Sequence, residues 1–567
     1  MSVDIRGIIS ERISEILDVP RDLLREIIEV PPNRNYGDYA FPCFRFAQQY
    51  KKSPPDIASI FEKKLVENIS RLKEISSVKA VGPYLNIFLD RSFISDRIVA
   101  EILEKDFSIS SKGLGKTVVI DYSSPNVAKP FGIGHLRSTV IGNSLKNIFS
   151  FLGYRVIGIN HLGDWGTQFG KLITAYKNWG DEDKLSENPV EYLYQLYVRF
   201  HREAENNPEL EEDARMWFKK LEEGDSEARS LWRRFRELSI EEFKRIYSRL
   251  GVDFDYYTGE SFYEPMLGKV VEMIKNSEIS ELSDGALIVP LEDMPPALIQ
   301  KKDGATLYLT RDIAAAVYRY EQYRFDLALY VVGAPQSLHF KQLFSVLKKL
   351  GYEWYRNCHH VPFGHIRFED ESMSTRKGNI ILLEEVLNKA VDLALKIIEE
   401  KNPSLENKSE IAEAVGIGAV IFNDLKNSRI KDIVFRWDEV LNFDGETGPY
   451  VQYTYARIRS LLAKYNLEYG VPLYREGLRF GEEVYPIVFL LNQFEDVVLR
   501  AASEFEPSII SRFVLDVCSE FNSFYNKYRV IGEESDVSLT RALVVKGVEK
   551  ILYNSLNMLG IKPVEKM

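Results

Sequence analysis

Two segments of the chain carry residue types that bind phosphate groups. The first, residues 121–139, reads DYSSPNVAKPFGIGHLRST. Gly132 and Gly134 would let the backbone approach a ligand closely, and His135, at the start of a helix, can donate to a phosphate oxygen. The helix N-terminus adds N–H groups and a positive dipole end. This segment predicts a phosphate site, and the alternative is a structural glycine turn around a buried histidine.

The second segment, residues 368–379, reads FEDESMSTRKGN. Arg376 and Lys377 are adjacent cations in a polar stretch that contains glycine. Cations on such a loop can clamp a triphosphate and offset the charge that develops in a transition state. The alternative for this segment is an exposed basic turn.

The elements around the first segment predict a nucleotide-binding fold. Residues 117–122 form an apolar, β-branched run typical of a buried parallel strand. Apolar residues at helical spacing follow over 136–152, and a second strand is expected over 155–159. The same alternation returns with a strand over 327–332 and a helix over 339–350. This order predicts a Rossmann-type doubly wound parallel sheet, in which ligands bind at the carboxyl ends of the strands.

At 567 residues, the whole chain is too long for one domain. We expect a multidomain α/β protein with an N-terminal α+β domain, a catalytic domain and a C-terminal all-α domain, with boundaries at 1–110, 111–440 and 441–567. Within the first domain the pattern predicts a helix over 55–75 and a strand over 84–89.

An insertion of about 180–290 divides the catalytic domain. Its charged middle predicts a solvated helical excursion without a chemical role. From about 410 onward the pattern is helical, without further strand–helix alternation.

Composition limits the class of protein. The chain is 45% hydrophobic and 28% charged, which is typical of a soluble globular protein. No stretch approaches the ~20 apolar residues of a membrane span, and no signal peptide is evident, so a cytoplasmic location is expected. The three cysteines lie far apart, so no structural zinc is expected. The net charge of −11 argues mildly against a nucleic-acid partner but does not exclude local basic patches.

Both phosphate-binding segments resemble signature motifs of class I aminoacyl-tRNA synthetases. Gly132–His135 resembles the HIGH motif, with flanks that resemble the arginyl branch, and Ser372–Lys377 resembles the KMSKS loop. Gly132 stands in place of the first histidine, and Ser372 and Thr375 stand in place of the two lysines. The resemblance implies catalytic roles for His135, Lys377 and Arg376. It implies ATP binding by Gly132, Gly134, His135, Met373, Ser374 and Lys377.

The same resemblance assigns an arginine pocket. A guanidinium is planar and always protonated, so a pocket that selects it needs carboxylates in fork geometry. The residues that match the pocket of the family are Asp121, Ser124, Asn126, Tyr308, Asp312 and Gln336. Of these, Tyr308, Asp312 and Asp121 are expected at the guanidinium, and the others at the α-amino and carboxylate groups. On physical grounds alone, Asp312 could instead be a helix N-cap.

Both ends of the chain resemble the tRNA-binding parts of arginyl enzymes. The N-terminal domain is expected to contact the D-loop corner of tRNA, and the C-terminal domain the anticodon loop, where bases stack on aromatic rings and guanidinium planes. The implied tRNA-binding residues are Tyr84, Asn86, Tyr455, Arg459, Tyr525 and Met567. Packing in a core is the alternative for such aromatic positions.

These expectations combine into one reaction. ATP, with the Mg²⁺ that it carries, activates L-arginine to arginyl-adenylate, and the arginyl group passes to the 3′ end of tRNA(Arg). Activation is expected to need bound tRNA, and the enzyme is expected to be a monomer without a membrane partner. The alternatives are a synthetase for another amino acid, a catalytically impaired paralogue that binds tRNA, and a small nucleotidyltransferase.

Overall fold

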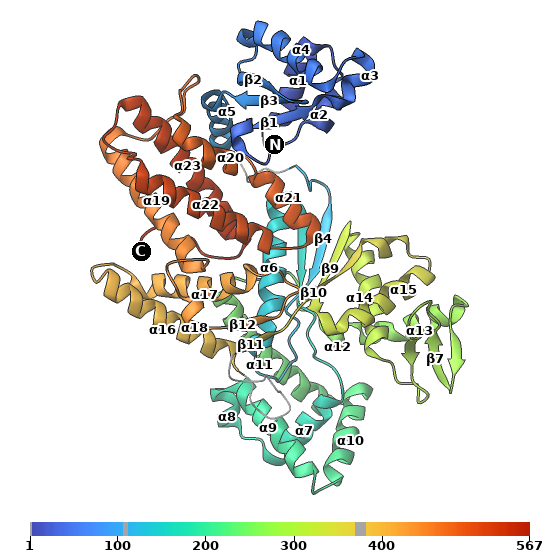
Figure 1. Cartoon of the computed structure of the whole chain (residues 1–567). Helices are drawn as coiled ribbons and strands as arrows, with labels where there is room; N and C mark the ends of the chain where they lie inside the picture. The colour runs from blue at the N-terminus through green and yellow to red at the C-terminus, as the bar shows by residue number, and fades with distance from the viewer. Residues whose placement is uncertain (1–2, 106–110, 369–380) are drawn as a thin grey trace.

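The centre of the molecule is a parallel sheet of four strands in the order β10-β9-β4-β5 (Figure 1). The computed structural model describes residues 3–105, 111–368 and 381–567. The strands are β4 (Thr117–Asp121), β5 (Arg155–Ile159), β9 (Leu327–Gly333) and β10 (Cys358–Phe363). Chain order reverses between β4 and β9, so the carboxyl end of β4 lies at the switch point where doubly wound sheets bind ligands. The expected Rossmann-type sheet is confirmed.

Alternating side chains of β4 face two different cores. Val118 and Ile120 pack in the core that includes helix α6 (Leu136–Phe151), whereas Val119 packs in a second core with helix α14 (Tyr308–Tyr323). This is the period of two that a strand imposes on its side chains. Because both faces are covered, β4 is apolar throughout except at its end, where it places Asp121.

The segment between β5 and β9 includes the long insertion. It forms helices α7 (Thr167–Trp179), α8 (Glu182–Glu187), α9 (Pro189–Ala204), α10 (Glu209–Glu223), α11 (Ser226–Leu250), α12 (Glu260–Tyr263) and α13 (Leu267–Asn276). It also contains an antiparallel sheet that the sequence did not predict, made of β6 (Glu281–Ser283), β7 (Ala286–Val289) and β8 (Ala297–Gln300). These strands are too short to show a clear alternation, and β6 is exposed at every residue.

The N-terminal part is a three-stranded antiparallel sheet covered by helices. Its strands β1 (Tyr39–Pro42), β2 (Ile75–Val81) and β3 (Tyr84–Leu89) pair in the order β1-β3-β2. The helices are α1 (Ile5–Leu17), α2 (Arg21–Ile27), α3 (Ala47–Tyr50), α4 (Pro54–Glu67) and α5 (Arg91–Glu104). Ser53 caps α4 by accepting from the Asp56 N–H. The expected helix over 55–75 is wrong at its end, because α4 stops at Glu67 and β2 begins at Ile75.

The C-terminal part is helical and packs against α6 (Figure 1). Its helices are α16 (Leu383–Lys401), α17 (Lys408–Leu425), α18 (Trp437–Val440), α19 (Gly448–Tyr469), α20 (Tyr485–Leu491), α21 (Phe494–Glu504), α22 (Ser508–Lys527) and α23 (Ser535–Met558). Ser144 of α6 donates to the carbonyl of Met558 at 2.9 Å, which ties the last helix to α6.

Two further features complete the fold. The region after residue 410, predicted as helical, also contains the short strand β12 (Ile433–Phe435), which pairs in parallel with β11 (Ile366–Phe368). Within the described ranges, none of the helices is long and apolar enough to cross a membrane.

Candidate active site

The loop after β4 is held in an unusual backbone conformation. Ser123 and Ser124 have φ values of 70° and 50°, a left-handed region that costs free energy for residues other than glycine. Three contacts hold this turn: the Ser123 N–H donates to Ser138 Oγ at 2.9 Å, Thr139 Oγ1 donates to Ser123 Oγ at 2.8 Å, and Ser123 Oγ lies 2.7 Å from Tyr247 Oη. The first turns of α6 and the end of α11 therefore fix where the loop points.

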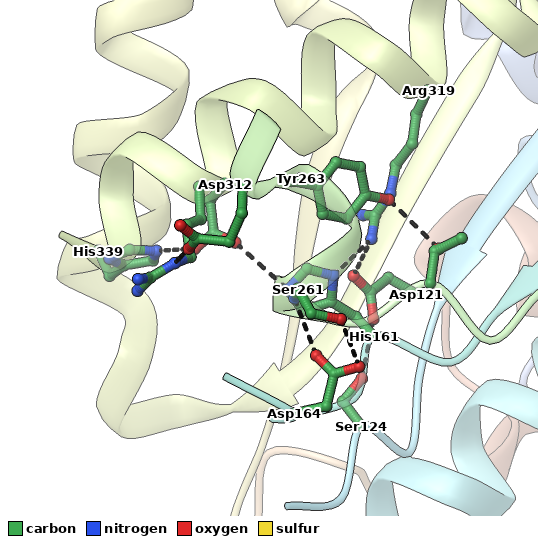
Figure 2. A network of polar contacts seen from close by, with 12 residues as sticks. Asp121, Ser124, His161, Asp164, Ser261, Tyr263, Asp312, Arg319 and His339 are labelled. Carbon is green, nitrogen blue, oxygen red and sulfur yellow. Dashed lines mark hydrogen bonds and ion pairs between the residues drawn. The ribbon is translucent and has the colours of Figure 1, made fainter. Parts of the chain in front are cut away.

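Asp121, at the end of β4, has an internal cation as its partner. Its Oδ2 lies 2.8 Å from Nη2 of Arg319, which is 1% exposed, and its Oδ1 accepts from Ser124 Oγ at 3.0 Å. Burial alone would lower the pKa of Arg319, but the charge of Asp121 raises that pKa well above its usual value. Arg319 Nη2 also donates to His161 Nδ1 at 3.3 Å. Asp121, which the sequence assigned to a substrate guanidinium, thus already binds a guanidinium of the chain itself (Figure 2).

Asp312, the second predicted acid, lies on α14 and is partly exposed. Its Oδ2 is 2.5 Å from His339 Nε2, and its Oδ1 is 3.9 Å from His161 Nε2 (Figure 2). The N-cap of α14 is Leu307, without a side-chain cap, so the alternative reading of Asp312 as a helix cap is excluded. Asp312 and Arg319 stand seven residues apart on α14, which puts them on the same side of the helix, two turns apart.

Glu260 is a third acid of this pocket, and the sequence analysis missed it. It is the first residue of α12, and its N–H donates to the carbonyl of Leu162, after β5, at 3.0 Å. Burial raises its pKa to about 8; Arg311 opposes this rise, and the charges of Asp312 and Asp164 add to it. No periodic or motif signal in the sequence connects Glu260 to Asp312, because a helix and a sheet separate them in the chain.

Asp164 joins the insertion to this pocket. It is fully buried, accepts from Arg236 Nε at 2.7 Å and accepts from the Ser261 N–H at 2.9 Å (Figure 2). Farther along α11, Ser239 Oγ accepts from the Ala128 N–H at 3.0 Å. The insertion is therefore not merely the solvated excursion that its charge pattern predicted, because α11 supports both the loop after β4 and the start of α12.

The HIGH-type turn forms the other end of the site. His135 is half-buried, and its ring lies tilted against that of Phe131 with 5.0 Å between centroids. Its Nδ1 is 3.3 Å from the carbonyl of Gly132. Burial lowers the pKa of His135, and the nearby charge of Lys129 lowers it further. Gly134 is exposed, and a Cβ added there would meet nothing within 4 Å, so the packing of the chain itself does not require a glycine. The open surface at Gly134 suits a ligand that approaches the backbone.

The segment 381–383 pairs with this turn. The Ile133 N–H donates to the carbonyl of Ile381 at 2.9 Å, and the Leu383 N–H donates to the carbonyl of Phe131 at 2.9 Å. These two bonds flank Gly132, which forms an antiparallel bridge with Leu382. Four predicted residues of the preceding loop, Met373, Ser374, Arg376 and Lys377, lie outside the described residues.

The remaining predicted pocket residues lie around the same strand ends. Asn126 is exposed and forms a parallel bridge with Gly163. Gln336 is exposed at the end of the 3-10 turn that follows β9, one residue before α15 (Ser337–Lys349). Tyr308 begins α14 and is 62% exposed. Their polar atoms are accessible to a ligand, in contrast to those of Asp121.

The predicted tRNA-binding residues of the C-terminal part differ in accessibility. Tyr455 is 2% exposed, so its ring offers no open face to a base, whereas Tyr525 is 37% exposed. Arg459 is paired with Glu549 at 2.9 Å and with Glu565 at 3.2 Å. Met567 is partly buried against the core. The accessible stacking surface near Tyr525 consists of Tyr453 and Arg457, whose guanidinium lies 4.9 Å from the ring centroid of Tyr453 and 5.3 Å from that of Tyr525.

At the N-terminal end, the two predicted residues also differ. Tyr84 is half-buried and packs edge-on against Phe44, at 6.1 Å between ring centroids. Asn86 is 4% exposed within β3, between Ala40 and Lys79 of the neighbouring strands. Tyr84 is therefore the accessible member of this pair.

The sheet, the HIGH-type turn and the acidic pocket define a class I aminoacyl-tRNA synthetase. Three family profiles match the chain: "tRNA synthetases class I (R), catalytic domain" over residues 98–437, "DALR anticodon binding domain" over 451–567, and "Arginyl tRNA synthetase N terminal domain" over 4–89. The chain belongs to the arginyl-tRNA synthetase family.

Known proteins of the family are similar along their full length. The chain is 49% identical to an arginine–tRNA ligase of Halothermothrix orenii over 98% of both chains, and 47% identical to that of Clostridium perfringens over 100% of both. Its structure is similar to the arginyl-tRNA synthetase of Thermus thermophilus, with a TM-score of 0.79 and 25% identity over 99% of this chain and 100% of the other. The Plasmodium falciparum enzyme shares the fold, with a TM-score of 0.77 and 24% identity over 100% and 99% of the two chains.

Proposed function

We propose how this chain carries out the reaction of its family, the ATP-dependent ligation of arginine to tRNA. The observation that carries the proposal is the group of acids at the strand ends beside the HIGH-type turn. Asp312 and Glu260 influence each other electrostatically, and Asp312 is partly exposed. Two neighbouring carboxylates match a planar cation that can donate to both.

Asp312 and Glu260 bind the guanidinium of arginine, with Tyr308 beside them. A bound guanidinium also favours the ionised form of Glu260, because an opposite charge stabilises a carboxylate. Asp121 contributes differently from the expectation based on the family motif: paired with Arg319, it holds Ser124 through its Oδ1. Ser124, Asn126 and Gln336 bind the α-amino and carboxylate groups, which places the arginine carboxylate toward the HIGH-type turn.

Activation depends on position and charge. The arginine carboxylate attacks the α-phosphate of ATP in line, forming arginyl-adenylate and releasing pyrophosphate, without a covalent bond to the enzyme. His135, whose lowered pKa keeps it neutral at pH 7, donates to a phosphate oxygen, and Gly132 and Gly134 leave room for the nucleotide. Arg376 and Lys377 contribute positive charge to the phosphates, with Met373 and Ser374 beside the nucleotide. The Mg²⁺ arrives as part of the ATP substrate. Among the described residues, no group of three or more His, Cys, Asp or Glu side chains is placed to hold a metal ion.

Transfer requires tRNA to contact both ends of the chain. We assign residues 1–110 to the D-loop corner, 111–440 to catalysis and 441–567 to the anticodon loop. Tyr84 is the accessible candidate in the first part, and Tyr525, Arg459 and Met567 belong to the last. Tyr453 and Arg457 extend this set, since bases stack on aromatic rings and on guanidinium planes. The chain acts as a monomer, and bound tRNA is needed for activation.

The proposal is tested by charging unfractionated tRNA, which contains tRNA(Arg), with radiolabelled arginine. Incorporation that depends on ATP and is absent with lysine supports it. Binding of tRNA without transfer of arginine would contradict it and favour the catalytically impaired paralogue, whose basis is the glycine at position 132 and the lysine-poor second motif. Restoring the motif histidine, Gly132→His, would then be the next variant to assay.

A further inference from the structure

His339 contacts Asp312, the acid that the proposed function assigns to the guanidinium of arginine. Its Nε2 lies 2.5 Å from Asp312 Oδ2, and the two side chains are 22% and 27% exposed. A carboxylate only accepts, so Nε2 of His339 is the donor. Asp312 therefore already accepts a hydrogen bond from within the chain at the oxygen where the guanidinium of arginine would donate.

The other histidine beside Asp312 is fixed in a different way. His161 Nδ1 accepts from Arg319 Nη2, because a guanidinium can only donate. In its neutral form the proton of His161 must then be on Nε2, which faces Asp312 Oδ1 at 3.9 Å. The Arg319 guanidinium therefore fixes the orientation of the His161 ring, whereas the contact that the structure gives His339 Nε2 is the one with Asp312.

The position of His339 allows an exchange of partners. It lies in the first turn of α15, three residues after Gln336, and it is partly open to solvent. The charged and titratable groups around it come from several elements: Asp312 on α14, His360 on β10, and, beyond Asp312, His161 after β5 and Glu260 on α12. Asp312 is the acid among them that His339 contacts.

We propose that His339 is a specificity-determining residue that competes with arginine for Asp312. This inference rests on the proposed function of Asp312. In the empty enzyme His339 donates to Asp312, and the guanidinium of arginine must displace it. Neutral His339 is a weak competitor against a cation with two parallel N–H donors, whereas protonated His339 forms an ion pair with Asp312 that only a well-placed guanidinium replaces.

A pH dependence of arginine binding follows from this competition. Histidine changes its charge between about pH 5 and 8, so lowering the pH strengthens the competitor. The KM for arginine should therefore rise several-fold from about pH 7.5 to about pH 6. Protonation of Glu260 also weakens arginine binding at lower pH. The contribution of His339 is therefore the difference in the pH dependence of KM between the wild-type protein and a variant that retains Glu260.

His339→Gln is that variant, because the glutamine amide can still donate to Asp312 but cannot become charged. His360→Gln is the matched control: His360 stacks on Phe340 at 4.5 Å between ring centroids and has its Nε2 2.9 Å from the carbonyl of Val332, away from Asp312. The assay is tRNA charging by the full-length chain with arginine as the varied substrate, and calorimetry of arginine binding without ATP is the second readout.

The expected result is a lower KM for His339→Gln at about pH 6, a flatter pH profile of that KM, and a wild-type profile for His360→Gln. A His339→Gln profile as steep as that of the wild-type protein, in KM and in calorimetric affinity, would overturn the inference. A loss of kcat without any change in the pH profile of KM would indicate a structural role and would also overturn it. Asp312→Asn tests the proposed function of Asp312 separately from the competition by His339. If this substitution leaves arginine affinity unchanged, the proposed role of Asp312 fails as well.

Discussion

Asp121 and Asp312 are two acids of one pocket with opposite kinds of partner. Asp121 lies at the end of β4, 6% exposed, beside a buried arginine that is always charged. Asp312 lies on α14, 27% exposed, beside the partly exposed His339. Arg319 cannot move away without leaving two unpaired charges in a buried environment. His339 is partly exposed and can turn toward solvent.

In the proposed function, this difference separates the acid that supports the site, Asp121, from the acid that we propose binds the substrate, Asp312. A buried ion pair costs a large amount of free energy to break, because the remaining charge has no solvent. A partly exposed pair contributes little to stability, and its members can exchange partners. The accessibility of the partner therefore supports our proposal that Asp312, rather than Asp121, binds the guanidinium of arginine.

The largest effect is expected from Arg319→Met, which would break the supporting pair. It leaves Asp121 buried without its cation, so the free energy of unfolding should fall by about 3–5 kcal/mol. Denaturant unfolding measures this change. Arg324→Met is the control, since Arg324 is an exposed arginine that follows α14, and it should change stability by less than about 1 kcal/mol. Equal stability of the two variants would remove the distinction between the two acids.

Asp312→Asn comes next, and its effect should fall on binding. Loss of a hydrogen bond to a charged group costs about 1.5–3 kcal/mol, so the KM for arginine should rise about ten- to hundredfold while stability stays within about 1 kcal/mol. Charging kinetics with varied arginine measure this. Asp303→Asn, in the exposed loop before α14, should keep the wild-type KM. If Asp121→Asn raises KM with unchanged stability and Asp312→Asn does not, the roles of the two acids are reversed.

Glu260→Gln sharpens the comparison through pH. The pKa of Glu260 is raised from 4.5 to about 8, so between these values the folded protein binds a proton that the unfolded chain has released. This group therefore makes stability fall as pH rises through that window. Relative to the wild-type protein, Glu260→Gln should gain a few degrees in Tm as pH goes from about 6 to about 8. Exposed Glu272→Gln should track the wild-type protein, and a parallel Tm profile for Glu260→Gln would argue against a raised pKa.

The smallest effect is expected from Ser124→Ala. It removes the donor to Asp121 Oδ1 but leaves Arg319 in place, so the loss is about 0.5–1.5 kcal/mol of arginine binding, a few-fold in KM, with little change in stability. Charging kinetics again measure it, with exposed Ser150→Ala as control. An unfolding effect as large as that of Arg319→Met would mean that Ser124 supports Asp121 as strongly as Arg319 does.

The local pattern of the sequence was sufficient for the main elements of the fold. The period of apolar residues predicted β4, α6 and β5, because a buried strand and an amphipathic helix are encoded within a single stretch of chain. The same local reasoning failed for β6–β8 and β12, which are three or four residues long and owe their existence to pairing with distant partners. The family was also evident from sequence, because its motifs are contiguous.

Only the tertiary structure decided which side chains meet in the site. The motifs placed Asp121 and Asp312 among the candidates, but the partner of each acid comes from elsewhere in the chain. Arg319, the partner of Asp121, lies on α14, and His339, the partner of Asp312, lies at the start of α15. Burial of Tyr455, and the approach of Glu260 to Asp312, likewise depend on packing between elements remote in sequence. The charge, exposure and hydrogen-bond partner of a side chain belong to its surroundings in space, whereas the sequence by itself determines its chemical type and its place along an element.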